Sequence, residues 1–304
     1  MPYATDLSRS GLTIDYSRDL LGVYTDMAAF YIVQKRSLEI LGYVYTRPEY
    51  IKIDENDVLF KPDLPSWVPD WRYRIDVRPL NKTGIVGPDY RIIYTPCPGT
   101  LVGAYTSSDR SLFIRGFVVD RISCLAPPGT TTAKNATELA TAKAFLREHD
   151  PTLAFTDEEF LRTTTVDADY RWDNEERTHC NIRRPHPSTT ELTGIDRELH
   201  VERQETVQHV CIFHQVGSTK EGRKLGLFPH AAREGDLVVA LSGGNALYVL
   251  GPDQGLDRER GEMRRYQFIG ECYIDGMMDG QAMELLKKDG GGEGGVQSRM
   301  FRLC

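Results

Sequence analysis

Residues 235–280 constrain the fold most, because they hold three β-type runs joined by turn residues. Leu237–Leu241 and Ala246–Leu250 are short apolar runs separated by Ser-Gly-Gly-Asn, and glycine and asparagine tolerate the positive φ angles of a tight reversal. Tyr266–Ile274 alternates with a period of two. The sequence therefore predicts a hairpin followed by a third antiparallel strand, which ends at the glycines of 275–280.

The alternation in the third run assigns its residues to two faces of the predicted sheet. One face would hold Tyr266, Phe268, Cys272 and Ile274, and the other would hold Gln267, Ile269, Glu271, Tyr273 and Asp275. Glu271 and Tyr273 would then lie about 6–7 Å apart, within reach of one bound molecule as base and hydrogen-bond donor. The alternative is that Glu271 pairs with Arg264 or Arg265 while Tyr273 packs in the core.

A second feature is the pair of tryptophans in Leu64–Trp71, which surround a proline. Pro69 removes a backbone donor and disfavours helix at the preceding residue. Trp67 and Trp71 are therefore expected to wedge large rings into a junction between parts of the fold. The alternative is that both rings line an apolar ligand cavity in which Asp70 supplies a carboxylate.

The rest of the chain predicts an α+β fold. Apolar residues at helical spacing over 14–42, after candidate caps at Asp15, Ser17 and Asp19, predict a long amphipathic helix. Further strands are predicted at 91–94, 101–105, 112–120 and 207–216, and further helices at 137–148 and 157–162. We expect an antiparallel β-sheet or partly closed barrel on which the long N-terminal helix and the other helices pack.

The domain organisation follows from local composition. Residues 1–288 are expected to form a single module, within which the polar stretch at about 163–200 is a surface excursion able to contact a protein partner. The Gly-rich run at 290–295 predicts a flexible tail over 289–304, with nothing ordered required after it.

Composition limits the partners. A net charge of -7 with interleaved charges gives no reason to expect nucleic acid or an anionic membrane. No apolar run approaches the ~20 residues of a membrane helix, the N-terminus does not resemble a signal peptide, and the six cysteines are scattered. We therefore expect a cytoplasmic protein with reduced thiols.

Known cofactor and metal motifs are missing from the sequence, including phosphate-binding loops, dinucleotide fingerprints, His-Glu-x-x-His and Gly-x-Ser-x-Gly. We expect no cofactor and no metal. Asp275 and Asp279 flank Gly-Met-Met and leave a hard-cation site as an alternative to turn capping.

Several blocks follow one another along the chain: Leu64–Trp71, Leu112–Ile122, Arg223–His230, Gly235–Val238, Tyr248–Leu250 and Ile269–Gly280. Together they resemble the region C-terminal to the effector domain of fungal heterokaryon-incompatibility (HET) proteins. One departure is Gly251, where family members usually carry arginine. The resemblance implies a background in non-self recognition between fungal strains, ending in cell death. The effector domain would precede Asp15, and we expect a stand-alone module without it.

Two functions remain open. In the first, the module is a small-molecule-binding protein, and as an enzyme it would be a cofactor-independent cyclase, isomerase or lyase of secondary metabolism. Its pocket would lie between the tryptophan loop and the third strand, with Glu271, Tyr273 and Asp70 as catalytic groups and Trp67, Trp71 and Asp275 as binding residues. In the second, the chain is a non-catalytic interaction or regulatory protein of heterokaryon incompatibility.

Overall fold

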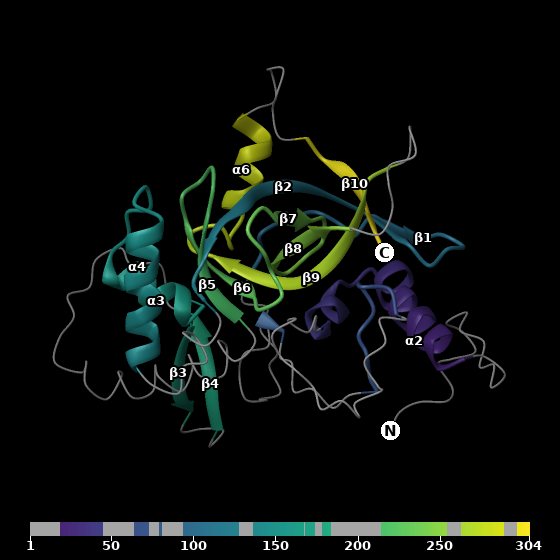
Figure 1. Cartoon of the computed structure of the whole chain (residues 1–304). Coiled ribbons are helices and arrows are strands. Elements are labelled where there is room, and N and C mark those ends of the chain that lie inside the picture. The colour runs from purple at the N-terminus through teal and green to yellow at the C-terminus, as the bar shows by residue number, and fades with distance from the viewer. Residues whose placement is uncertain are drawn as a thin grey trace, which may run out of the picture.

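The computed structural model (Figure 1) describes residues 19–44, 64–72, 79–80, 94–127, 136–166, 168–173, 178–183, 214–253, 263–288 and 297–304. The helices are α2 Leu20–Ala29, α3 Ala136–His149, α4 Asp157–Thr164 and α6 Gln281–Lys288, with a π-turn at Phe30–Gln34 and a 3-10 turn at Glu39–Tyr43. The strands are β1 Ala104–Thr106, β2 Leu112–Leu125, β3 Ala168–Asp173, β4 Thr178–Arg183, β5 His214–Thr219, β6 Leu225–Pro229, β7 Leu237–Leu241, β8 Leu247–Pro252, β9 Arg265–Ile274 and β10 Arg299–Leu303. The fold is α+β, as predicted.

The sheet closes on itself. Neighbouring strands pair in the order β2-β5-β6-β9-β8-β7, and a further pairing of β7 with β2 completes a ring of six antiparallel strands in the described part of the chain. The predicted hairpin forms β7 and β8, and the predicted third strand is β9 beside it. The expected antiparallel barrel is therefore confirmed.

Close contact between β2 and β7 requires a glycine. A Cβ atom at Gly116 would lie 2.5 Å from the Ala240 carbonyl oxygen, well inside van der Waals contact. Gly116 of β2 pairs with Leu241 of β7 at the start of this ladder. The ring closes here because the side chain is missing.

The predicted faces of β9 need a correction. Phe268 pairs with Leu250, and Gly270, whose φ is 152°, pairs with Val249, so Ile269 is an extra residue between them. This bulge resets the alternation. Phe268 belongs to one hydrophobic cluster and Cys272 to the other, although the sequence predicted them on one face.

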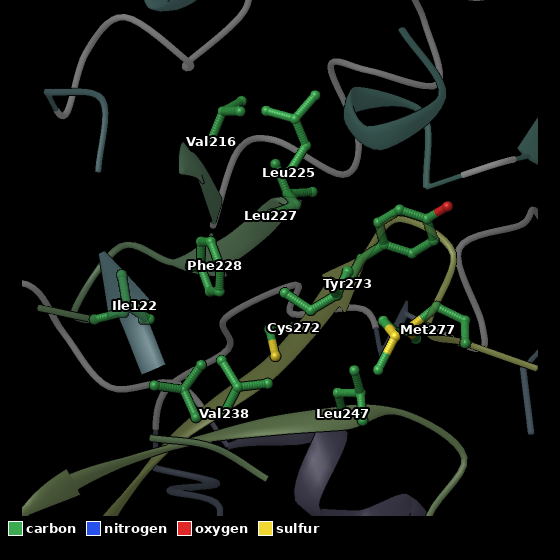
Figure 2. Packing of buried hydrophobic residues seen from close by; sticks show 14 of the residues in the cluster. Ile122, Val216, Leu225, Leu227, Phe228, Val238, Leu247, Cys272, Tyr273 and Met277 are labelled. Atoms are coloured by element: carbon green, nitrogen blue, oxygen red, sulfur yellow. The ribbon is translucent and has the colours of Figure 1, made fainter. Parts of the chain in front are cut away.

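Buried residues of the described chain form two hydrophobic clusters. The first combines side chains from β2 and β5–β9 with side chains from α3, α4 and α6, and Figure 2 shows Ile122, Phe228, Val238 and Cys272 gathered in it from four strands. The second lies beside α2 and contains Trp67, Tyr248, Phe268 and the inward residues of β10. Both clusters depend on β7, β8 and β9, whose alternate residues point to opposite sides.

The N-terminal helix is shorter than predicted. Asp19 caps α2, since its carboxylate accepts a hydrogen bond from the Gly22 amide at 3.1 Å. The helix continues as a π-turn to Gln34, and Arg36 then has a φ of 51°. That left-handed residue ends the helix, so the prediction of one helix over 14–42 was wrong.

The tail also differs from the prediction. Residues 299–303 form β10, which pairs with β2 on one side and β9 on the other. Phe301 and Leu303 are fully buried. A flexible tail that continues to residue 304 was therefore wrong, because an apolar-alternating strand follows the Gly-rich run.

The remaining predictions concern two helices, the polar excursion and segments that the structure does not describe. The helices expected at 137–148 and 157–162 are α3 and α4, and α4 starts with a capping box between Thr156 and Glu159. The expected polar excursion contains the β3–β4 hairpin, while residues 184–213 lie outside the described part of the chain, as do 1–18 and 91–93. The single-module organisation stays a prediction.

Candidate functional site

The tryptophan loop places its two rings differently. Trp67 is fully buried in the second cluster, and its indole Nε1 donates a hydrogen bond to the Arg110 carbonyl at 3.2 Å. Trp71 is 43% exposed and contacts the Tyr24 ring edge-to-face, with centroids 5.1 Å apart. Trp67 is therefore the wedge that the sequence predicted, and Trp71 is a surface residue.

Ser66 joins the tryptophan loop to two strands. Its hydroxyl donates to the Cys304 carbonyl and accepts from the Phe268 amide at 2.8 Å. The Ser66 amide also donates to the Cys304 carbonyl, at 2.8 Å. These bonds hold the loop against β9 and the end of β10.

Glu271 lies in the body of the protein. Its side chain is buried, and Oε2 accepts a hydrogen bond from the Leu80 amide at 2.8 Å. A Cβ atom at Gly42 would lie 2.9 Å from Oε1, which shows how closely the 39–43 turn covers the carboxylate. Arg265 pairs with Asp253 and Arg264 stacks on Tyr266, so neither arginine is the partner proposed from sequence.

The Glu271 carboxylate also acts on its neighbours. Complete burial raises the pKa of the Tyr248 phenol on β8 well above its usual value. The charge of Glu271, which is the Cα partner of Tyr248 on β9, raises it further. Burial and the same charge raise the pKa of the Cys272 thiol. Both groups therefore stay protonated at neutral pH.

Tyr273 and Asp275 are brought together at the end of β9. The Tyr273 hydroxyl donates to Asp275 Oδ1 at 3.2 Å. Arg162 of α4 donates to both Asp275 oxygens, from Nε and Nη2, each at 2.7 Å. This bidentate pair ties α4 to the ring. Asp275 therefore binds a guanidinium in this structure.

Asp70 has a local partner. Arg72 donates to it from the backbone amide at 3.1 Å, from Nε at 2.8 Å and from Nη2 at 2.5 Å. Both side chains are about three-quarters covered. The carboxylate closes a turn at the end of the tryptophan loop.

The six site residues predicted from sequence do not form one constellation among the described contacts. Tyr273 packs in the first cluster beside Tyr94, and Trp67 packs in the second. Two cavities, of about 390 and 260 Å³, are lined by other residues. The assigned catalytic and binding roles therefore stay predictions.

Glu271→Gln is expected to lower the free energy of unfolding by about 1–2 kcal/mol, because the charge-assisted hydrogen bond to Leu80 becomes a neutral one. Urea denaturation measures the difference. Glu284→Gln, at an exposed position on α6, is the control and should stay within about 0.5 kcal/mol of wild type. An unchanged urea midpoint for Glu271→Gln would contradict a structural role for this carboxylate.

Sequence reasoning missed three buried acids that position loops. Asp120 accepts from the amides of Arg121, Glu221 and Gly222 at 2.7–2.9 Å, which holds the β5–β6 turn. Asp236 accepts from the Arg233 amide at 2.8 Å. Asp150, at the end of α3, accepts from the Ser218 hydroxyl at 2.6 Å. The sequence feature that could have identified two of them is an aspartate directly beside an apolar strand run, as at 120 and 236.

The larger cavity lies between α2 and the turn before β2, and its lining includes Asp19, Thr25, Asp26, Arg110 and residues 106–108. The smaller one has a mostly apolar lining of Val119, Ile274, Met277 and Leu285, and the charged residues Asp120, Glu221 and Lys224 also line it. No group of three or more potential metal ligands occurs within the described ranges. The helices of the described chain include none both long and apolar enough to cross a membrane.

Comparison with known protein families gives one match, and it covers most strands of the ring. The family model of the Het-6 beta-barrel domain matches residues 197–290, which contain β5 to β9 and α6 and are less than a third of the chain. No curated protein and no solved structure matches. The match indicates a relation between this barrel and the HET family, in agreement with the sequence blocks found at 223–280.

Proposed function

We propose that the chain is a non-catalytic recognition protein related to heterokaryon incompatibility, which acts in the cytoplasm by binding another protein. The observation that carries this proposal is an exposed apolar stripe along α2 and the π-turn that follows it. Leu20, Val23 and Tyr31 are 50%, 41% and 46% exposed, and the half-exposed Trp71 lies against Tyr24 beside them. Exposed aromatic and aliphatic residues that gather in one place are typical of protein interaction sites.

The groups expected to do chemistry support the same proposal, because each has a structural partner. Glu271 binds the Leu80 amide, the Tyr273 hydroxyl binds Asp275, and Asp70 binds Arg72. Burial raises the pKa of the Cys97 thiol to about 12 and that of Cys124 to about 11. Thiols with such pKa values are poor nucleophiles at neutral pH.

The test is expression in a filamentous fungus, with fusion of the transformed strain to a panel of otherwise compatible strains. We expect dye-permeable, dying fusion cells in at least one pairing. Trp71→Ala with Tyr31→Ser should abolish this death while lowering the melting temperature by no more than about 5 °C. The control Glu148→Gln, at an exposed position of α3, should preserve the death. Survival in every pairing, together with turnover of a metabolite that Glu271→Gln abolishes, would contradict the proposal.

Small-molecule binding is the second candidate, and the cavity of about 260 Å³ favours it. Its lining also includes Lys224, Asp120 and Glu221. Three backbone amides bind the Asp120 carboxylate and Glu221 is exposed, so the Lys224 ammonium group is the one that suits a small aromatic or aliphatic carboxylate. Thermal shift with benzoate and short fatty acids would measure binding. A shift that disappears in Lys224→Gln supports this candidate, and no shift with any acid argues against it.

A further inference from the structure

Strand β10 fills a slot between two strands of the ring. Residues 299–303 pair antiparallel with Gly116–Leu112 of β2, and Arg302 and Leu303 pair parallel with Arg265 and Tyr266 of β9. The yellow C-terminal strand lies along β2 in Figure 1. Hydrogen-bonding edges on both sides therefore define the position of this strand.

Side chains of β10 anchor it in two ways. Phe301 and Leu303 are fully buried in the second cluster, and the Phe301 ring packs edge-to-face on Tyr266 with centroids 5.6 Å apart. Between them Arg302 points to the polar side, where it donates to Asp109 at 2.6 Å and to the Ser111 hydroxyl at 3.2 Å. The slot thus binds an extended segment in which an arginine lies between two apolar residues.

The ring does not need β10 for closure. All six pairings of β2, β5, β6, β9, β8 and β7 are made without it. Removing the strand would leave these ladders in place and expose the β2 edge at 112–116 together with the β9 edge at 265–266. An open, apolar strand edge of this kind is a template for another extended chain.

The route to the slot also favours exchange. β10 follows α6 directly in the described part of the chain. It is joined to α6 by residues 289–296, of which five are glycine. From composition alone, the sequence predicts little preference for one backbone path in such a connection.

We propose that β10 is an exchangeable strand, and that the slot of one molecule accepts residues 299–303 of a second copy of this chain. The second copy fits because its strand carries the same residues and reproduces the same register, from Phe301 opposite Ile114 to Arg302 beside Asp109. Exchange replaces each contact by an identical one between molecules, so its equilibrium depends on protein concentration.

A crosslink between chains tests this directly. Met300 and Arg115 are Cα partners across β10 and β2, and both side chains lie outside the core, so cysteines at these positions can form a disulfide. One chain carries Arg115→Cys and the other Met300→Cys, and both carry Cys304→Ser to remove the half-exposed native thiol. After mixing at high concentration under mild oxidation, we expect a covalent heterodimer on non-reducing gels, in a yield that rises with concentration.

Two further variants complete the design. Phe301→Asp on the Met300→Cys chain should lower the heterodimer yield about tenfold or more, because it places a charge in the buried slot. A chain with both cysteines reports pairing within one molecule, and each single variant alone reports background. If the double variant crosslinks internally while mixed single variants give only background at every concentration, exchange does not occur.

Discussion

Replacing Trp67 with alanine is expected to lower the free energy of unfolding by about 3–5 kcal/mol, the range measured for large aromatic residues removed from cores. The ring is fully buried among side chains of α2, β8, β9 and β10. Its loss leaves a cavity and also removes the donor that the Arg110 carbonyl uses. Chemical denaturation followed by circular dichroism measures the change.

Trp71→Ala is the matched control, since it removes the same side chain from the same loop at an exposed position. It should cost no more than about 1 kcal/mol, through the edge contact with Tyr24. Equal losses for the two variants would contradict this assignment of one buried wedge and one surface ring. The sequence alone did not distinguish them, because both tryptophans flank the same proline and differ only in the direction of the loop.

Local patterns predicted the elements that local forces determine. The Ser-Gly-Gly-Asn turn between two apolar runs specified the β7–β8 hairpin, and the helical pattern of 157–162 specified α4. Local sequence patterns could not predict that the ring of strands closes. Closure depends on the missing side chain of Gly116 at its contact with Ala240, about 120 residues further along the chain.

The wrong expectations have specific causes. Period-two alternation assumes a regular strand, and the bulge at Ile269 and Gly270 shifts every later residue of β9 by one position. Five glycines before residue 296 concealed β10, because the apolar alternation that follows covers only Phe301 and Leu303. The N-terminal pattern was helical on both sides of Arg36, and periodicity does not report a single left-handed residue.

The candidate site was harder to predict than the fold. The sequence identified Glu271, Tyr273 and Asp275 as neighbouring polar groups on one strand, but their partners come from distant segments, namely Leu80 and Arg162. An acid beside an apolar run has the same appearance whether it binds a ligand or a backbone amide. Only the tertiary contacts separate the two roles, and here they favour structure over chemistry.

The Asp236→Asn variant is expected to become more stable relative to wild type as pH rises from about 4 to 7, by about 2–3 kcal/mol. Burial raises the pKa of Asp236 to about 6, while the Arg233 amide and side-chain charge act in the opposite direction. The ordinary aspartate pKa is about 3.9, so the unfolded chain loses the proton first. Stability from the protonated carboxyl is therefore full below about pH 4 and is lost as pH rises through 6.

Denaturation of both proteins across this pH range gives the difference, in which contributions from all other groups cancel. Glu234→Gln, an exposed neighbour, should instead run parallel to wild type. A constant difference between Asp236→Asn and wild type would mean that Asp236 ionises normally in the folded protein.

Gly251 offers an independent test of the ionisation of Asp236, because a Cβ atom there would lie 3.4 Å from Asp236 Oδ1 and 3.3 Å from Ile269 Cδ1. Gly251→Arg places a cation beside the buried carboxylate, at the cost of a small movement of Ile269. If a nearby positive charge offsets the burial that raises the pKa of Asp236, the arginine should stabilise the wild-type aspartate at pH 7 more than the Asp236→Asn form, and the two effects should converge near pH 4. A double-mutant cycle measured at both pH values isolates that coupling, and equal coupling at both would show that the two residues do not interact through charge.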